Sequence, residues 1–168
     1  MNSAQLKSIA IVTMLIDHTG AILFPDLLVL RMIGRLAFPI FAFLLVEGYF
    51  HTKNVRKYLI RLGIFALISE VPFDWALFNN PFYVWYQNIF FTLFIGLVTI
   101  WIFDRNKEIK PPVAWATLIG ASMVSIFLGV DYNILGIMSI FLFYRYHDER
   151  PRALFSVGLL HVMYGVLG

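Results

Sequence analysis

Long apolar runs alternate with short polar joints along most of the chain. Each run is close to the roughly 20 apolar residues that an α-helix needs to cross the hydrocarbon core of a bilayer. The joints contain residues that interrupt helices, such as Pro25, Pro81 and the pair at 111–112. The pattern predicts about seven transmembrane helices, at 6–24, 28–50, 57–77, 84–103, 112–129, 132–146 and 152–168. The connection at 129–133 is very tight, so the fifth and sixth runs form either a helical hairpin or a partly re-entrant pair.

Composition supports a membrane environment. Of the 168 residues, 60% are hydrophobic and only 14% are charged, and the mean hydropathy is +0.79. A soluble domain of this length has too little interior to hide so much apolar surface. We therefore expect an all-α, polytopic transmembrane helix bundle that forms a single integral membrane domain over residues 1–168. The net charge of +3 is too small and scattered to indicate nucleic-acid binding, and the absence of cysteine excludes disulfides and a thiol nucleophile.

The positions of lysine and arginine predict the orientation. Basic residues are concentrated in alternate joints, namely Lys53, Arg56 and Lys57, then Arg105, Lys107 and Lys110, then Arg145, Arg150 and Arg152. The intervening joints at 25–30, 78–83 and 129–133 contain none. Because cytoplasmic joints carry the excess of basic residues, this alternation places the N-terminus in the cytoplasm. The first run has no small-residue cleavage site, so we expect it to be a retained helix and not a signal peptide.

Several spans carry polar side chains at one predicted depth. At 1.5 Å per residue, His18 lies about 18 Å above the cytoplasmic start of its helix, and Glu70 about 20 Å above the start of the third. Arg35 lies roughly 11 Å below the outer start of the second span, which is nearly the same height. Ionisable residues inside a membrane are costly and are functional by default. The layer comprises Asp17, His18, Arg35, Glu70 and Thr92. Asn88 lies just outside it, and Arg31 lies one turn from Arg35 on the same face of the second helix.

The layer has a structural and a catalytic interpretation. The structural one is a cluster of ion pairs that fixes helix order. The catalytic one makes His18 a general base, because a neutral imidazole beside a pairable acid suits that role near neutral pH. Asp17 and His18 are adjacent and point about 100° apart on a helix, so we expect Asp17 to pair with an arginine while His18 faces a separate cavity. We also expect Arg35 to neutralise a buried acid, so that its replacement impairs folding. The four histidines have no helical metal-ligand spacing, so no metal is predicted.

Three stretches carry a family resemblance. They are an Ile-Asp-His element in the first helix, GRLAFPIFAFLLVEGY in the second, and SEVPFD followed by NIFFT at the third and fourth. Together they resemble the TraX family of bacterial integral membrane proteins, over roughly the first hundred residues. The resemblance implies a multi-pass protein of the bacterial inner membrane that transfers an acetyl group from acetyl-CoA, as in N-terminal acetylation of a pilin. It points to Asp17 and His18 for catalysis, and it places Arg31, Arg35, Glu47, Glu70, Asn88 and Thr92 within family-like segments.

A mechanism follows as a hypothesis. His18 acts as base or transient acyl carrier, Asp17 orients it, and Arg35 stabilises developing negative charge. The predicted substrate-binding residues are Arg31, Glu47, Glu70, Asn88 and Thr92, and those predicted to hold the CoA phosphates are Lys53, Arg56 and Lys57. Acyl-CoA is the donor, and a peptide amine, a sugar hydroxyl or a lipid headgroup is the acceptor, with membrane lipid around the chain. The alternatives are a proton- or anion-coupled transporter and a noncatalytic membrane assembly partner.

Overall fold

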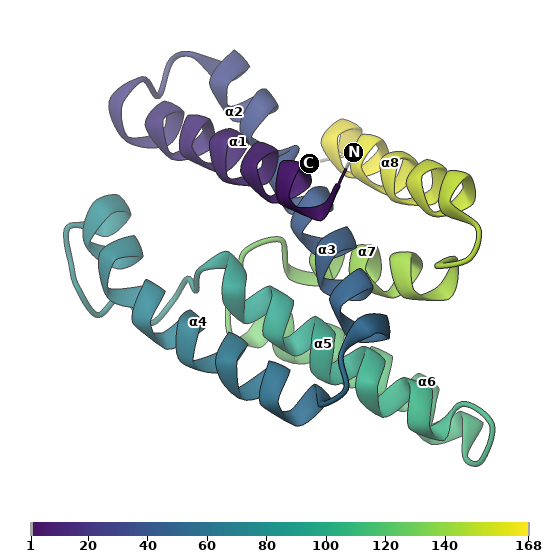
Figure 1. The fold of residues 1–168 in the computed structure, drawn as a ribbon. Coiled ribbons are helices and arrows are strands. Elements are labelled where there is room, and N and C mark those ends of the chain that lie inside the picture. Colours follow the sequence, from purple (N-terminus) through teal and green to yellow (C-terminus); the bar gives the residue numbers. More distant parts are fainter. Residues whose placement is uncertain (1, 168) are drawn as a thin grey trace.

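A computed structural model describes the backbone of residues 2–167 and the side chains of residues 2–163. The described chain is helical throughout, apart from short connections (Figure 1). The helices are α1 (Ser3–Leu23), α2 (Leu28–Gly34), α3 (Ala37–His51), α4 (Val55–Phe78), α5 (Ile89–Asn106), α6 (Pro111–Phe127), α7 (Asn133–Arg145) and α8 (Arg150–Leu167). The predicted all-α membrane bundle is confirmed, and the seven predicted runs correspond to these helices with α2 and α3 together forming the second.

Two predicted boundaries are wrong, each for a physical reason. The second run is not one uninterrupted helix, because it breaks between Gly34 and Ala37. Pro39 lies in the first turn of α3, where its ring cannot donate to the carbonyl of Arg35 and would clash with it in a continuous helix. The fourth run begins at Ile89 and not at 84, because Asn88 caps α5 by accepting a hydrogen bond from the Phe90 amide at 2.9 Å.

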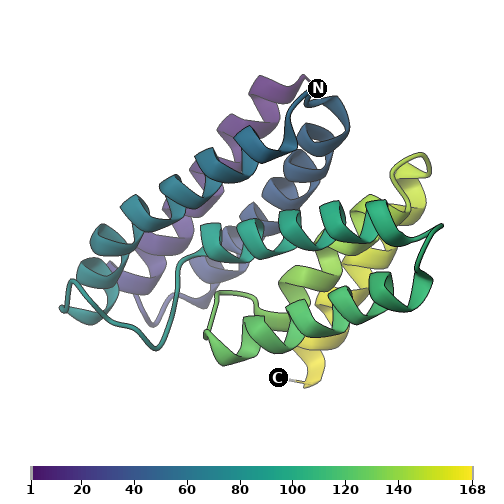
Figure 2. The same cartoon turned by 90° about the horizontal axis from the view of Figure 1, so that it is seen from below.

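Helix α5 lies at the centre of the bundle. It packs against α4, α6 and α7, and α3 crosses over α5 and α7 (Figures 1 and 2). Most of the buried apolar side chains come from α3, α5 and α7, including Phe38, Val46, Leu97, Ile137 and Ile140. Helices α1 and α2 form a hairpin that lies against α3. Helix α1 also contacts α4, where His18 lies against Phe73.

Large apolar side chains cover the outside of the bundle as well as its core. Leu15, Met32, Ile68 and Phe127 are all more than 60% exposed, which suits contact with lipid better than contact with water. Within the described residues, three helical units are long and apolar enough to cross a membrane: α1, α2 with α3, and α5. Helices α6 and α7 are shorter apolar helices. The fold therefore defines a helical membrane protein.

Two connections meet at the predicted outer end. The segment between α4 and α5 pairs with the segment between α6 and α7 through a single parallel bridge of Gln87 and Val130. The Gln87 amide donates to the Gly129 carbonyl at 3.1 Å, and the Asp131 amide donates to the Gln87 carbonyl at 3.0 Å. Gly129 has φ +60° and packs against the Trp85 carbonyl, so a side chain there is excluded. The bridge holds Tyr86, Asp131 and their neighbours above the bundle.

Candidate functional site

An ion pair joins the first two helices inside the predicted polar layer. Arg31 Nη1 of α2 lies 2.7 Å from Asp17 Oδ2 of α1. The side chains of Arg31 and Asp17 are 38% and 21% exposed, so both are shielded from solvent only in part. The predicted pairing of Asp17 with an arginine is confirmed, and the partner is Arg31. Gly34 packs against Asp17 in the next turn of α2, where a Cβ would overlap the Asp17 Cα and Cβ.

The His18 ring is separate from this ion pair. His18 Nδ1 lies 2.8 Å from the carbonyl of Met14 on the preceding turn of α1. Because a carbonyl oxygen only accepts hydrogen bonds, Nδ1 carries a proton and donates it. In the neutral ring the lone pair is therefore on Nε2. The ring also packs edge-on against Phe73 of α4, with centroids 6.3 Å apart. The predicted divergence of Asp17 and His18 is thus confirmed.

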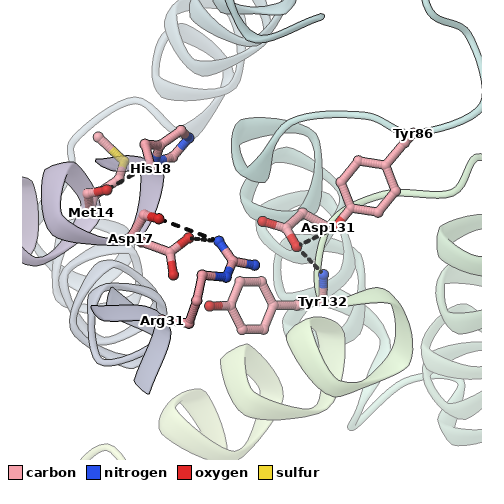
Figure 3. Close-up of polar contacts among 7 residues, drawn as sticks. All are labelled: Met14, Asp17, His18, Arg31, Tyr86, Asp131 and Tyr132. Atoms are coloured by element: carbon pink, nitrogen blue, oxygen red, sulfur yellow. Dashed lines mark hydrogen bonds and ion pairs between the residues drawn. The ribbon is translucent and has the colours of Figure 1, made fainter. Parts of the chain in front are cut away.

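Asp131 is a site residue that the sequence analysis missed. The Tyr86 hydroxyl donates to Asp131 Oδ1 at 2.8 Å, and the Tyr132 amide donates to the same oxygen at 3.0 Å (Figure 3). The Thr92 hydroxyl donates to the Asp131 backbone carbonyl. Figure 3 shows the Asp131 carboxylate directed toward the region that holds Asp17 and Arg31. A carboxylate in a tight joint reads as a helix breaker in sequence, so the only available signal was its place between two spans.

The surroundings of Asp131 raise the pKa of its carboxyl above the ordinary value. Burial raises the pKa of the Asp131 carboxyl, the hydrogen bonds from Tyr86 and Tyr132 lower it, and the nearby Asp17 carboxylate raises it further. Burial and the Asp131 carboxylate likewise raise the pKa of the Tyr86 and Tyr132 hydroxyls, which remain protonated donors near neutral pH. The site therefore combines one imidazole, two carboxylates, an arginine and two phenols.

Glu70 and Asn88 bind each other at the edge of this region. Glu70 Oε2 accepts from the Asn88 backbone amide at 3.1 Å and also from its side-chain amide. The Asn88 side chain donates in addition to the Ala66 carbonyl at 2.9 Å. Asp74, one turn beyond Glu70, is 1% exposed and accepts from the Tyr83 amide at 2.8 Å. These contacts fasten α4 to the start of α5, and they use most of the hydrogen-bonding capacity of Asn88. The role of Glu70 and Asn88 in substrate binding stays a prediction.

Other predicted site residues lie apart from His18. Arg35 follows the last residue of α2 and is exposed. The expectation that it neutralises a buried acid is wrong, because Arg35 is exposed and the arginine that pairs with Asp17 is Arg31. Glu47 lies at the opposite end of α3, with its Oε1 3.3 Å from His147 Nε2. Lys53, Arg56 and Lys57 are exposed around the start of α4, on the predicted cytoplasmic side.

A cleft of about 1000 Å³ leads from that cytoplasmic side toward the polar cluster. Its walls come from α1, α3, α4 and α5, and its deep end includes Met14, Ser69 and Phe90. Met14 is the residue whose carbonyl holds the His18 ring. The cleft therefore ends one helical turn below His18. Its lining is Ser3, Leu6, Lys7, Ile11, Met14, Phe41, Phe43, Leu44, Leu45, Glu47, Gly48, His51, Tyr58, Leu62, Phe65, Ser69, Phe90, Leu93 and Arg150.

A polytopic helical membrane protein with a polar cluster above an apolar cleft is the class that these observations define. The chain belongs to the TraX protein family, whose model matches residues 2–167. The predicted family is therefore confirmed, and the match extends beyond the first hundred residues.

Individual relatives agree with this assignment. The chain is 30% identical over 157 residues to the probable fimbrial assembly protein FimC, serogroup H1, of Dichelobacter nodosus, covering 87% of this chain and 63% of that protein. It is 28% identical over 167 residues to protein TraX of Escherichia coli K12, covering 94% and 62%. An uncharacterised protein of Rickettsia prowazekii is 33% identical over 103 residues, covering 61% and 37%. The chain thus spans less than two thirds of the length of these relatives. No solved structure matches it.

Proposed function

We propose that this chain is a membrane-embedded acyltransferase that moves an acyl group from acyl-CoA to an amine or hydroxyl acceptor. The observation that carries the proposal is the state of His18. Its Nδ1 donates to the Met14 carbonyl, which leaves Nε2 as the basic nitrogen of the neutral ring, and Met14 lines the deep end of a cleft that opens to the predicted cytoplasmic side. A base within reach of both a donor channel and an acceptor site is what acyl transfer needs.

The donor enters from the cytoplasmic side in this proposal. Most of the cleft wall is apolar or aromatic, including Phe41, Leu44, Leu62 and Phe65. The pantetheine arm of an acyl-CoA is thin and uncharged, so it suits such a wall, and the thioester at its tip then lies near Met14 and His18. The acceptor approaches from the opposite side, where Tyr86, Asp131 and Tyr132 lie in connections outside the helices.

The chemical step uses His18 as a proton carrier. The acceptor nitrogen or oxygen attacks the thioester carbonyl while Nε2 takes its proton. Collapse of the tetrahedral intermediate breaks the carbon–sulfur bond, and the imidazolium returns that proton to the departing CoA thiolate. Asp131 and Asp17 stabilise the transient imidazolium by charge, since Asp17 itself is hydrogen-bonded to Arg31 and not to His18. The phenol of Tyr132 and the guanidinium of Arg31 are the donors available to the oxyanion.

Acetyl as the acyl group and a pilus protein as acceptor rest on the family. The Dichelobacter nodosus relative is described as a fimbrial assembly protein, and the model that matches this chain is that of the TraX protein. The first of these names connects a relative of this chain with the assembly of fimbriae, which are surface filaments. An acceptor exposed at the outer face of the membrane is consistent with the position of the polar cluster.

The test is incorporation of labelled acetyl from acetyl-CoA into a membrane extract by the purified full chain in proteoliposomes. His18→Ala is expected to lower the rate by at least 100-fold, because general base catalysis contributes about 10²–10⁴. Leu15→Ala on the lipid-facing side of α1 is the matched control and is expected to retain the wild-type rate. A His18→Ala protein that folds, inserts and still transfers acetyl at the wild-type rate would refute the role of His18 as the base. A wild-type protein that transfers no acetyl would refute the acyltransferase proposal.

A further inference from the structure

The lining of the cleft changes from apolar to basic at its cytoplasmic end. Along most of its length the lining is apolar, but three basic side chains from three helices surround the mouth: Lys7 of α1, His51 of α3 and Arg150 of α8. These residues are separated by 44 and 99 positions in the sequence. Only the fold brings them together. A hydrophobic slot with a cationic opening is complementary to a molecule with an anionic head and an uncharged tail.

The charges at the mouth are accessible. The Arg150 side chain is 67% exposed, and its Nη2 lies 3.7 Å from Glu47 Oε1, which is a loose contact. Glu47 Oε1 also lies 3.3 Å from His147 Nε2, so Arg150 is not its sole partner. Lys7 is exposed on the first turns of α1. Lys7 and Arg150 both stay charged at neutral pH, and each side chain is exposed enough to turn toward a bound anion.

The neutral ring of His51 has no free hydrogen-bond donor for an anion at the mouth. Its Nδ1 lies 2.7 Å from the Glu47 carbonyl and must donate to it, because a carbonyl only accepts. The neutral ring then offers a phosphate no donor. Phosphate binding at this opening consequently depends on Lys7 and Arg150.

We propose that Lys7 and Arg150 bind the phosphate groups of the acyl-CoA donor at the mouth of this cleft, with the pantetheine arm extended along its apolar walls. The inference rests on the proposed function, and it names the donor site of that reaction. It also differs from the sequence-based prediction, because Lys53, Arg56 and Lys57 are not among the residues that line the cleft.

The dimensions support this assignment. From Tyr58 to Ser69, both in the lining, α4 rises about 16 Å. From Lys7 to Met14, α1 rises about 10 Å, and His18 follows about 6 Å further on. A phosphate held at Lys7 is thus about 16 Å from His18 along α1, and the arm of the ligand must bridge this distance. The phosphate itself cannot enter the apolar part of the cleft without losing its hydration.

The experiment measures binding and not turnover. Calorimetric titration of the full chain in detergent micelles with CoA is compared among wild type, Lys7→Gln, Arg150→Gln and Lys110→Gln. Lys110 is an exposed lysine of the same predicted face that lies outside the cleft lining, and it is the matched control. Each of the first two substitutions is expected to raise the Kd for CoA about tenfold, the effect of losing one charge-assisted hydrogen bond, whereas Lys110→Gln changes it less than twofold.

The outcomes separate the two proposals. If wild type binds CoA and neither Lys7→Gln nor Arg150→Gln weakens binding, or Lys110→Gln weakens it equally, the phosphate site is wrong and the acyltransferase proposal stands. Arg56→Gln and Lys57→Gln are titrated in the same way. If these two variants weaken CoA binding and Lys7→Gln and Arg150→Gln do not, the phosphate site lies beside the start of α4 and the proposed site is wrong. If wild type does not bind CoA, the acyl-CoA-dependent function is refuted together with the site.

A second ligand tests the cleft itself. Pantetheine lacks the nucleotide, so its Kd is expected to be unchanged by Lys7→Gln and Arg150→Gln. Leu44→Trp places a large ring in the apolar wall and is expected to raise the Kd of both CoA and pantetheine at least tenfold. Unchanged pantetheine binding in a folded Leu44→Trp protein would show that the arm does not occupy the cleft. A monodisperse elution profile confirms that each variant is folded.

Discussion

Gly34 of α2 lies directly against the Cα and Cβ of Asp17 in α1, one turn beyond the arginine that pairs with that carboxylate. This contact sets how closely the two helices approach. Gly20 makes the reciprocal contact, because a Cβ there would meet Leu30 Cβ at 2.8 Å. The ion pair of Asp17 and Arg31 thus depends on two glycines that allow close helix packing, an arrangement common between membrane helices.

Gly34→Ala is therefore expected to separate α1 from α2. The added methyl overlaps the backbone of Asp17, which cannot rotate away, so the free energy of unfolding should fall by about 1–3 kcal/mol. The thermal unfolding midpoint in detergent measures the change. Gly120→Ala is the matched control, since a Cβ at that helical position meets nothing within 4 Å, and it should be neutral or stabilising by up to about 1 kcal/mol. Equal midpoints for the two variants would contradict this account.

Arg31→Gln should destabilise the protein more than Arg35→Gln. The first substitution leaves the partly buried Asp17 carboxylate without its ion-pair partner, at a cost of about 1–3 kcal/mol. The second changes an exposed side chain at the end of α2 and should alter the unfolding free energy by less than about 0.5 kcal/mol. Chemical denaturation of both variants decides the order. A larger loss for Arg35→Gln would restore the sequence-based expectation.

The raised pKa of the Asp131 carboxyl predicts that the free energy of unfolding depends on pH. Because burial raises the pKa of its carboxyl in the folded state, the folded protein binds that proton more tightly than the unfolded chain does. The corresponding stabilisation is complete below the ordinary carboxyl pKa of about 3.9 and is lost as the pH rises through the raised pKa. Asp131→Asn should remove this slope from a plot of unfolding midpoint against pH.

Tyr86→Phe gives the companion measurement for Asp131. The lost hydroxyl no longer favours the charged carboxylate, so the pKa of Asp131 rises further and the decline in stability extends to higher pH. A pH profile of Asp131→Asn that matches wild type would show that another group is responsible.

Asn88→Ala should cost more than an ordinary helix cap. It removes the cap of α5 and also leaves Glu70, which accepts from both the backbone and the side chain of Asn88, with a weaker set of donors. The expected loss is about 2–3 kcal/mol. Asn54→Ala removes only an exposed cap, whose side chain accepts from the Lys57 amide at 2.9 Å, and should cost about 1 kcal/mol. Unfolding free energies that differ by less than the experimental error would refute a joint role of Asn88 and Glu70.

The sequence predicted more of the fold than of the candidate site. Helix positions were recovered because apolar length is a local property, and the break at Gly34 had a visible signal in Pro39. The pairing of Asp17 was predicted, but not the choice of Arg31 over Arg35. Both arginines lie within one helical turn, and the choice depends on how α2 rotates against α1.

The sequence by itself determined that this is a helical membrane protein of the TraX family with ionisable residues inside its spans, because each run of about 20 apolar residues satisfies its own backbone hydrogen bonds as a helix. Only the tertiary structure decided which polar groups meet. Tyr86 and Asp131 are 45 positions apart, and Lys7 and Arg150 reach one cleft from opposite ends of the chain. Such contacts depend on the rotation and crossing of whole helices and on the path of two connections, which no local pattern of residues specifies.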